Sequence, residues 1–364
     1  MPYPVIYGGV FDLFYKLEHL HKKGIHIHLH CFVYDKIQEQ NELTKYCATV
    51  NYYKRNKNIL SLFSNIPFIV FSRKNKILFN NLLKDNYPIL MEGIHCSYLI
   101  TNKKFTHRKK YIRLHNIESI YYAEIAKAEK NLFKKWYYKR ESSLLKKYEN
   151  SIKNKIDSFI CVAQKDEETI LKFGFTNTNY VPIFLPNWAI TTSSEGEKFC
   201  LYHGDLSVVT NEETALWLYN NVFKKVNTLF IIAGKNPSEK IKKIINNSSN
   251  AKLISNPNNN EMQTLIAAAH VNIIYAESVT GIKLKLLNAL FNGKHCITNT
   301  TTVSKTNLEV LCKIADTAEE IKNMVEIVLT QSFTNEEAEL RRQTLKNIFN
   351  NEKSAQRLIN IVWK

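Results

Sequence analysis

Short apolar runs alternate with amphipathic stretches along most of the chain. The apolar runs have the length of β-strands and lie at residues 25–34, 68–72, 89–92, 111–115, 159–162, 199–203, 229–233, 272–276 and 295–298. Apolar residues with helical spacing lie between several of them, at 11–23, 212–223, 262–269 and 283–292. This alternation predicts an α/β fold with parallel sheets and crossover helices. Many of the runs lack a polar face, as expected where helices cover both sides of a sheet.

A polar segment divides the 364 residues, which are too many for one ordinary core. Residues 187–198 are rich in small and polar residues, which is typical of a linker. We therefore expect two Rossmann-like domains, over 1–186 and 199–349. The tail from Asn335 onward has the pattern of two helices, of which 350–364 is the last.

The cysteines and the hydropathy pattern indicate the cellular compartment in which we expect the protein. Seven cysteines are scattered singly, as is typical of small core residues in a reducing compartment. The longest uncharged apolar runs are too short to cross a bilayer. The N-terminus shows no basic region followed by an apolar stretch and a cleavage site. We expect a cytoplasmic protein, with a peripheral position on the inner membrane as one interpretation.

The net charge of +17 is concentrated in the first half of the chain. Residues 1–186 carry 30 Lys and Arg against 16 Asp and Glu, whereas 187–364 carry 20 against 17. Residues 127–147 contain eight Lys and Arg beside aromatic residues such as Phe133 and Trp136. This pattern suits a helix on an anionic membrane surface. RNA contact and an ordinary helix with its aromatic residues in the core remain alternatives, although no RNA-module motif is present and no nucleic-acid partner is expected.

The segment 277–285 follows a predicted strand of the second half and leads into a helix. Ligands of doubly wound sheets bind beyond the carboxyl ends of the strands. Thr280 and Gly281 are expected at the helix start, where backbone N–H groups are free. Lys283 and Lys285 are then in the first turn, where cations are unfavourable unless a phosphate binds between them. The alternative is an ordinary capped helix with solvated lysines.

Glycines after other predicted strands permit the backbone to approach a ligand closely. Gly204 follows one strand of the second half, and Gly234 with Lys235 follows the next. Gly8 and Gly9 precede the first predicted helix and resemble a backbone cradle for phosphate or sugar. Simple turns explain each of these glycines equally well, and there is no GxGxxG dinucleotide motif.

Two polar clusters end predicted strands of the first half: Glu92 with His95, and Arg113 with His115, Asn116 and Glu118. Both clusters reach the same edge of a parallel sheet, where carboxylates and imidazoles serve as acids, bases or hydroxyl-binding groups. Histidines at 26, 28 and 30 alternate along one strand face, but no carboxylate or cysteine partner is evident on that face. Asp-x-Asp is also absent, so we expect no metal and no other cofactor.

Taken together, the motifs PYPxxxGG, EGIH, RLHNIE, HGDL, AGKNPS and TGIKLKLLNALFNGKH resemble a group of bacterial glycosyltransferases common in Bacteroidetes. This group is related to the retaining glycosyltransferase family 4 and has the GT-B architecture, in which two Rossmann-like domains face a cleft. The resemblance covers nearly the whole chain. It implies that the C-terminal domain holds a sugar nucleotide, that the N-terminal domain holds the acceptor, and that the last helix packs back on the first domain.

The resemblance also implies roles for individual residues. Lys283 and Lys285 would neutralise the donor diphosphate, Gly204 and Gly234 would admit the donor, and His115 would lie near the transferred sugar. The sequence departs from family 4 at two points. Glu277 is followed eight positions later by Lys285 instead of glutamate, and Asn288 stands where the helical glutamate would fall. Family members also begin with a strand before the PYP motif, so we expect a truncated start or a first sheet that lacks a central strand.

The expected function is transfer of a sugar from a nucleoside-diphosphate sugar to a hydroxyl of a lipid-linked or cell-envelope glycan. We expect a metal-independent, retaining enzyme of the hexosyltransferase class. Three alternatives stay open: a sugar-nucleotide 2-epimerase of the same fold, a basic RNA-binding protein and an inactive GT-B scaffold.

Overall fold

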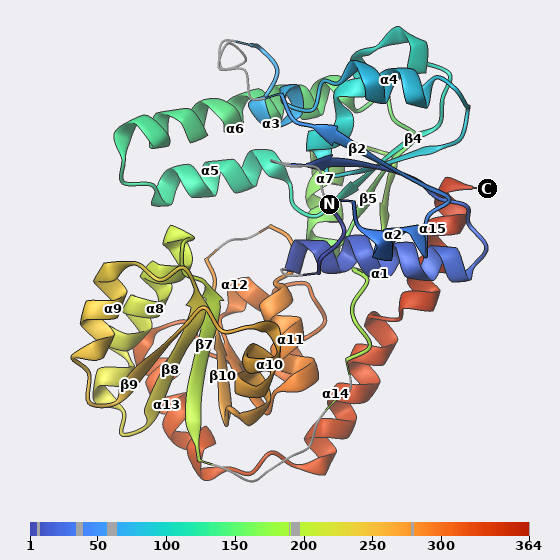
Figure 1. The fold of residues 1–364 in the computed structure, drawn as a ribbon. Coiled ribbons are helices and arrows are strands. Elements are labelled where there is room, and N and C mark those ends of the chain that lie inside the picture. Colours follow the sequence, from blue (N-terminus) through green and yellow to red (C-terminus); the bar gives the residue numbers. More distant parts are fainter. Residues whose placement is uncertain are drawn as a thin grey trace. The chain divides into compact units, whose positions relative to one another are not determined.

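The computed structural model describes residues 1–5, 8–33, 39–56, 64–188, 190, 197–277 and 280–363. The chain divides into two compact units, and each has its own sheets and helices (Figure 1). Unit 1 comprises Met1–Pro186 and Phe349–Lys364, and unit 2 comprises Asn187–Ile348. All strand pairs between described residues are parallel, as the sequence predicts. Most of the predicted linker, residues 189 and 191–196, lies outside the described residues.

The sheet of unit 2 has the strand order β12-β11-β10-β7-β8-β9. Its strands are β7 (Phe199–Asp205), β8 (Leu229–Lys235), β9 (Ala251–Ser255), β10 (Val271–Ile274), β11 (His295–Thr298) and β12 (Lys313–Ile314). The chain starts in the centre with β7, runs outward to β9, and returns to β10 on the other side of β7. The direction of winding thus reverses between β7 and β10. In doubly wound sheets, this switch point is where ligands bind.

Helices cover both faces of this sheet. They are α8 (Val209–Asn221), α9 (Glu239–Asn246), α10 (Asn259–Ala268), α11 (Leu284–Asn292), α12 (Thr300–Val303), α13 (Ala318–Thr330) and α14 (Asn335–Ile348). Alternate residues of β7 enter two different cores: Cys200 and Tyr202 pack in one, and Phe199 and Leu201 in the other. Because both faces are buried, the strand has no polar face in the sequence.

Unit 1 contains two separate sheets among the described residues. One pairs β1 (His28–Val33) with β2 (Thr49–Lys54), and the other has the order β3-β4-β5-β6. The strands of the second sheet are β3 (Ile89–Glu92), β4 (Lys110–Leu114), β5 (Ser158–Cys161) and β6 (Thr178–Tyr180). In the described part of unit 1, no strand precedes α1 (Gly8–Lys22), and none joins the two sheets.

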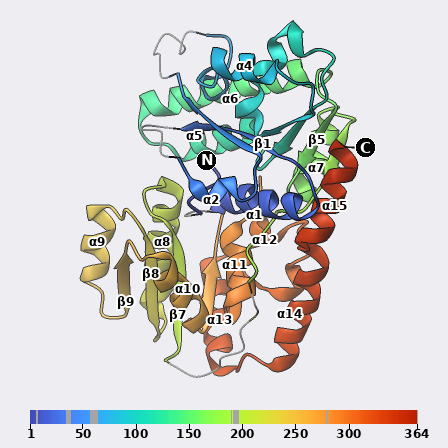
Figure 2. The same ribbon diagram turned by 45° about the vertical axis from the view of Figure 1, so that its right-hand side comes forward.

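The helices of unit 1 include the last helix of the chain. They are α1, α2 (Asn41–Thr44), α3 (Phe68–Phe71), α4 (Lys76–Leu82), α5 (Glu118–Ala128), α6 (Leu132–Ile152), α7 (Gln164–Lys172) and α15 (Asn351–Val362), with 3-10 turns η2 (Ile94–Thr101) and η3 (Lys103–Phe105). In α15, Ala355, Leu358 and Val362 share a core with Leu20 of α1 and Tyr111 of β4. Figure 2 shows α1 and α15 side by side. The tail of the chain thus forms the two helices that the sequence predicts, α14 in unit 2 and α15 in unit 1.

The strand prediction for residues 68–72 is wrong, because these residues form helix α3. Pro67 stands at its N-cap, and its carbonyl accepts hydrogen bonds from the N–H groups of Val70 and Phe71. The N–H of Phe68 donates to Glu141 Oε2 of α6 at 2.7 Å. A run of four apolar residues followed by Ser72 does not distinguish a buried strand from a short buried helix, and here a distant carboxylate stabilises the helix start.

None of the described helices is both long and apolar enough to cross a membrane.

Candidate functional site

A buried charged network connects α1 to the carboxyl ends of β3 and β4 in unit 1. We call it the α1–β4 cluster: Asp12 and Lys16 of α1, Glu92 at the end of β3, Arg113 in β4, and His115 just after β4. Asp12 and Lys16 are one helical turn apart and therefore face the same side. Glu92 and Arg113 are paired in register between β3 and β4. The parallel sheet brings the two predicted polar clusters together at its edge.

The Asp12 carboxylate and the Arg113 guanidinium form the centre of this cluster. Arg113 Nε lies 2.6 Å from Asp12 Oδ2, and Nη2 lies 2.7 Å from Oδ1. Both residues are 0% exposed. Burial raises the pKa of the Asp12 carboxyl, but Arg113 and Lys16 lower it more, so that this pKa lies well below its ordinary value. Arg113, predicted as an acceptor or phosphate ligand, is thus held inside unit 1 by Asp12.

Lys16, Glu92 and His115 form the less buried side of the cluster. Lys16 Nζ lies 2.6 Å from Glu92 Oε1 and 3.2 Å from Asp12 Oδ2. His115 Nε2 lies 3.3 Å from Glu92 Oε2 and 3.6 Å from Asp12 Oδ2, and its side chain is 23% exposed. Burial raises the pKa of the Glu92 carboxyl, but Lys16 and the hydrogen bond with His115 lower it below the ordinary value. His115 is therefore an accessible imidazole that two carboxylates orient.

The three ligand atoms of Asp12, Glu92 and His115 lie within 4.8 Å of one another, a spacing that a metal ion could bridge. The positive charges of Arg113 and Lys16 already balance the two carboxylates. A cation would have to displace the Lys16 ammonium and would then lie beside a permanently charged guanidinium. A metal ion here would therefore compete with two positive charges that are already paired with the carboxylates.

His95 lies near this cluster, in the first turn of η2. Gly93, between β3 and η2, has a φ of +80°, and a Cβ atom there would overlap the His95 ring. Glycine is required at this position for both reasons. Burial, followed by the charge of Arg73, lowers the pKa of His95 well below its ordinary value, so its imidazole is neutral at pH 7.

The other predicted residues of the first half lie around the same sheet edge. Asn116 is half-buried directly after His115. Glu118 is the first residue of α5, and burial together with the charge of Glu149 raises its pKa to about 7. Gly8 and Gly9 do not form a loop before the first helix, as predicted, but are the first two residues of α1. Their N–H groups belong to the first turn, where a helix has free donors.

A second group of polar residues lies at the switch point of unit 2. The segment after β10 leads into α11, whose N-cap is Lys283. The helix begins at Leu284, and Thr280 and Gly281 lie in the preceding loop, so their predicted place at the helix start is wrong. Gly281 has a φ of +70°, a conformation that favours glycine. Because α11 begins only at Leu284, Lys283 and Lys285 lie on either side of its first residue.

Backbone oxygens and an aromatic ring surround the two lysine ammonium groups. Lys283 Nζ donates to the carbonyl of Thr280 at 2.6 Å. Lys285 Nζ lies 3.4 Å from the carbonyl of Tyr275, just after β10, and 5.0 Å from the ring centroid of Tyr202 in β7. No carboxylate forms an ion pair with Lys285 among the described residues. Burial, and then the charge of Lys283, lower the pKa of Lys285 to about 8.

His203, at the carboxyl end of β7, belongs to the same switch point. Its side chain is 6% exposed, and burial followed by the charge of Lys285 lowers its pKa to about 3. Its Nε2 atom has no hydrogen-bond partner among the described residues. A neutral imidazole nitrogen and two ammonium groups are thus held together near the start of α11. Such a group can bind an anion.

The two glycines predicted to admit a ligand lie inside strands and not in the loops after them. Gly204 and Gly234 are partners in the register of β7 and β8. A Cβ on Gly234 would clash with the carbonyl oxygen of Gly204. The close approach of β7 and β8 is therefore one reason why residue 234 is a glycine. A Cβ on Gly204 would lie 3.4 Å from the Asn211 side chain, which leaves more room. Lys235 is the half-buried last residue of β8.

Asn288 lies on α11, where the resemblance places a helical glutamate. Its Oδ1 accepts a hydrogen bond of 2.7 Å from Asn292 one turn later. Five residues of these two sites were not predicted from the sequence: His203, Tyr202 and Tyr275 in unit 2, and Asp12 and Lys16 in unit 1. The sequence does contain a signal for Asp12 and Lys16, because an acidic and a basic residue four positions apart follow the Gly-Gly pair on the first helix.

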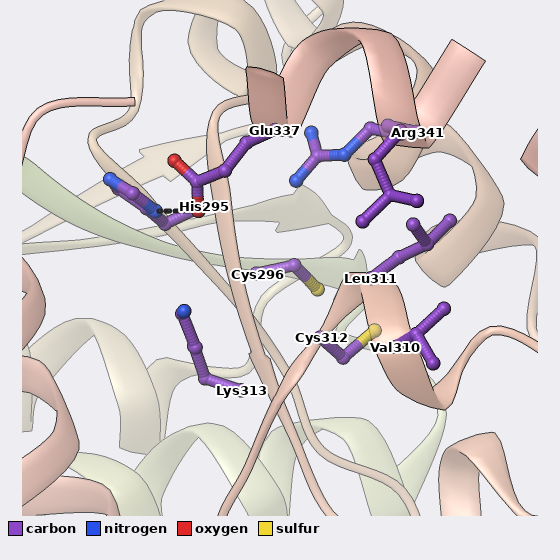
Figure 3. Close-up of a pocket in the computed structure, with 9 residues that line it drawn as sticks. His295, Cys296, Val310, Leu311, Cys312, Lys313, Glu337 and Arg341 are labelled. Carbon is purple, nitrogen blue, oxygen red and sulfur yellow. Dashed lines mark ion pairs between the residues drawn. The ribbon is translucent and has the colours of Figure 1, made fainter. Parts of the chain in front are cut away.

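A pocket on the far edge of unit 2 contains none of the predicted site residues (Figure 3). It lies between β11, β12 and α14, and among its lining residues are Cys296, Cys312 and Glu337. Arg341 reaches from α14 to the carbonyls of Gly293 and Lys294 at 2.8 and 2.7 Å. These bonds tie α14 to the end of α11, which indicates a structural role for this arginine.

No protein-family model matches the chain. An uncharacterized 44.6 kDa protein in the cps region of Klebsiella pneumoniae is 28% identical over 312 residues, which cover 80% of this chain and 78% of that protein.

Solved structures with a similar fold include TarM, with a TM-score of 0.59 and 14% identity over 76% of this chain. This chain spans about half of TarM, 54% of its length. The structure of Anabaena HepE in complex with UDP and glucose has a TM-score of 0.66 and 11% identity, and the match covers 97% of this chain and 95% of HepE. These similar structures are GT-B glycosyltransferases, and the chain has the GT-B fold.

Proposed function

We propose that this protein is a glycosyltransferase that moves a sugar from a nucleoside-diphosphate sugar to a hydroxyl group of a glycan or lipid-linked acceptor. One observation carries the proposal. Lys283 and Lys285 place two ammonium groups at the switch point of unit 2, where Lys285 is balanced by a carbonyl oxygen and an aromatic ring. Partly buried positive charge without a paired carboxylate is costly unless an anion binds. A diphosphate supplies such an anion.

The same lysines explain how transfer is accelerated. When the bond between the sugar and the diphosphate breaks, negative charge develops on the departing phosphate. Lys283 and Lys285 stabilise that charge from fixed positions, and the neutral His203 ring contacts the donor. HepE, which has the same fold, binds UDP and glucose, and this supports a UDP-sugar as the donor.

Unit 1 binds the acceptor, and His115 contacts the reacting groups there. Two carboxylates hold its imidazole at a sheet edge, with Nε2 directed toward Glu92 and Asp12. Glu92 is a weak base because Lys16 lowers its pKa, and His95 is a weak base because burial lowers its pKa. Glu92 and His95, the two candidate bases of an inverting reaction, are thus both weak, and this supports a retaining reaction in which the leaving phosphate accepts the acceptor's proton while His115 orients the sugar.

Finer features of the proposal follow from the same residues. Reaction without a metal fits a cluster in which Arg113 and Lys16 balance the carboxylates. Kinship with family 4 is supported by the resemblance of the TGIKLKLLNAL motif, within which Lys285 and Asn288 depart from the family pattern. The Klebsiella relative encoded in a cps region supports a capsule or cell-envelope glycan as the product.

A thermal-shift screen with UDP-, GDP- and CMP-sugars tests the donor site. A ligand at a hundred times its dissociation constant stabilises the folded protein by about 2.7 kcal/mol. We expect one nucleotide class to do so, and Lys283→Ala to abolish the shift. A product assay with the best donor and a panel of glycan acceptors then tests transfer, and NMR of the anomeric proton distinguishes retention from inversion. If no nucleotide sugar stabilises the protein, the proposal is wrong.

A further inference from the structure

The hairpin formed by α5 and α6 carries the most exposed large apolar side chains of the described residues. The two helices lie side by side in unit 1 (Figures 1 and 2). At the start of α6, Phe133 is 87% exposed, Leu132 78% and Trp136 65%. Their spacing places them on one side of the first turns of the helix. We call these three residues the hairpin tip. A cluster of this kind is uncommon on a soluble surface and indicates a partner.

The rest of the hairpin does not need the tip for its own packing. Tyr122 of α5 packs edge to face on Tyr138 of α6, with ring centroids 5.9 Å apart. Further along α6, Leu145 and Tyr148 are buried in the core of unit 1. These contacts hold α6 against α5. The exposed tip is therefore available for an interaction outside the hairpin.

Basic residues surround the tip and continue along the exposed side of α6. The exposed lysines are Lys127, Lys130, Lys134, Lys139, Lys146 and Lys147. The acidic groups of α6 point inward: Glu141 accepts a hydrogen bond from the Phe68 N–H, and Glu149 accepts from Ser119. The outer side of the hairpin thus combines an apolar end with positive charge.

We propose that the hairpin tip inserts into the surface of an anionic lipid bilayer, with the surrounding lysines against the lipid headgroups. An apolar face rimmed by lysines is the combination that binds membrane interfaces. Self-association through the tip is disfavoured because the lysines of two copies would repel each other. An RNA surface would use the rings of Phe133 and Trp136 for stacking but would leave the equally exposed Leu132 without a role, whereas a bilayer accommodates all three side chains.

This inference does not depend on the proposed transferase activity. It concerns residues 132–139, which are separate in the sequence from the α1–β4 cluster and from the switch point of unit 2. A variant of the tip should therefore keep its response to a nucleotide sugar, and a variant of Lys283 should keep its membrane binding. Failure of one proposal can thus be told apart from failure of the other.

Co-sedimentation of the full chain with vesicles tests the proposal. We expect binding to vesicles of phosphatidylcholine with 30 mol% phosphatidylglycerol, and at least tenfold weaker binding to phosphatidylcholine alone. Each lysine near an anionic surface contributes about fivefold to partitioning. The double variant Lys134→Glu/Lys139→Glu should therefore bind at least tenfold more weakly than the wild type, and so should Phe133→Ser/Trp136→Ser.

Two matched controls separate the tip from general effects of the substitutions. Ile77→Ser removes an apolar side chain of α4 that is 65% exposed, like Trp136. Lys224→Glu/Lys225→Glu makes the same change of charge at two exposed lysines of unit 2. Both controls should bind within twofold of the wild type. Circular-dichroism melts should show that every variant is folded, and Trp136→Phe should bind normally but lose the lipid-induced blue shift of tryptophan fluorescence.

Three results would overturn the proposal. The first is equal binding to the two vesicle types, or undiminished binding by both tip variants. The second is a gel-shift assay in which the tip variants lose RNA binding while their vesicle binding is unchanged, which would identify an RNA surface. The third is a dimer in light scattering that dissociates in Phe133→Ser/Trp136→Ser, which would identify a contact between copies of the chain.

Discussion

Asp12 of α1 and Arg113 of β4 form a two-point ion pair in the interior of unit 1, although 101 residues separate them in the sequence. Arg113 also donates to the carbonyls of Val181 and Pro182 at 3.2 and 3.0 Å, and the N–H of Phe184 donates to Asp12 at 2.8 Å. The pair thus ties α1 to the sheet and to the segment that leads out of unit 1. It also fixes the carboxylate that faces His115.

Asp12→Ala should lower the free energy of unfolding by about 3–5 kcal/mol, because it leaves the Arg113 charge buried without a partner. Urea unfolding monitored by circular dichroism measures this loss. Glu18→Ala is the matched control: it breaks the exposed pair with Lys22 on the same helix and should cost less than about 1 kcal/mol. An Asp12→Ala variant as stable as the control would show that the pair does not hold unit 1 together.

The same pair predicts a loss of stability in acid. The pKa of Asp12 in the folded protein is well below the ordinary value of 3.8 for an aspartate. The unfolded chain therefore binds more protons in acid, and this carboxylate contributes stability that is present above pH 3.8 and declines as the pH falls. The wild type should lose more stability than Asp12→Asn between pH 5 and pH 3, as measured by urea unfolding. Parallel pH profiles would contradict the assignment.

Lys285→Met should make the protein more stable and impair donor binding. The substitution removes a charge that burial disfavours, and the methionine side chain keeps the contact with Tyr202. We expect stability at pH 7 to rise by about 1 kcal/mol and UDP affinity to fall at least tenfold, as measured by urea unfolding and calorimetric titration. Lys252→Met, at an exposed position of β9, is the control and should change neither. A stable variant with normal UDP affinity would remove Lys285 from the donor site.

UDP affinity should fall as the pH rises above about 8, the pKa of Lys285 in the folded protein. Only the protonated lysine attracts the diphosphate, and burial makes Lys285 lose this proton below the ordinary lysine pKa of 10.5. By the same linkage, the unfolded chain binds more protons between these two values, so that Lys285 makes the unliganded protein more stable as the pH rises. Calorimetric titrations from pH 7 to 9.5 test the first effect, and Lys285→Met should remove most of the dependence.

His115→Asn should lower turnover by about 10²–10⁴-fold without unfolding the protein, because the ring is 23% exposed and is positioned at the reacting groups. His107→Asn, at an exposed histidine of unit 1, is the control.

EDTA should leave wild-type activity unchanged, since Arg113 and Lys16 balance the carboxylates that could bind a cation. Activity that EDTA abolishes and a divalent ion restores would overturn the metal-independent mechanism.

Gly204→Ala and Gly234→Ala should separate a ligand role from a packing role. At Gly234, the new methyl group meets the Gly204 carbonyl oxygen, so we expect a loss of about 1–3 kcal/mol in stability. At Gly204, the nearest side chain is 3.4 Å away, so a lower UDP affinity in a stable protein is the expected result. Unfolding curves measure the stability of both variants, and calorimetric titration measures their affinity for UDP. Normal UDP affinity in Gly204→Ala would show that Gly204 has no role in donor binding.

The pattern of the sequence was enough for the class of the fold. Runs such as 159–162 and 229–233 are apolar on both faces, and only a sheet covered on both sides buries such strands, which makes parallel pairing the natural outcome. The strand prediction for 68–72 failed because four apolar residues in a row suit a short helix as well as a strand. Its helix start is stabilised by Glu141, more than seventy positions away, and a local pattern contains no information about that contact.

The sequence by itself determined the alternation of strands and helices and the residue types that end the strands, since both follow from local spacing. Only the tertiary structure decided which of those residues meet. It placed Arg113 against Asp12 in the interior and left His115 accessible, and it put Lys285 against Tyr202 and the Tyr275 carbonyl. The physical reason is that charge and reactivity depend on burial and on neighbours brought in by other strands, and the order of strands in a sheet is a property of the whole fold.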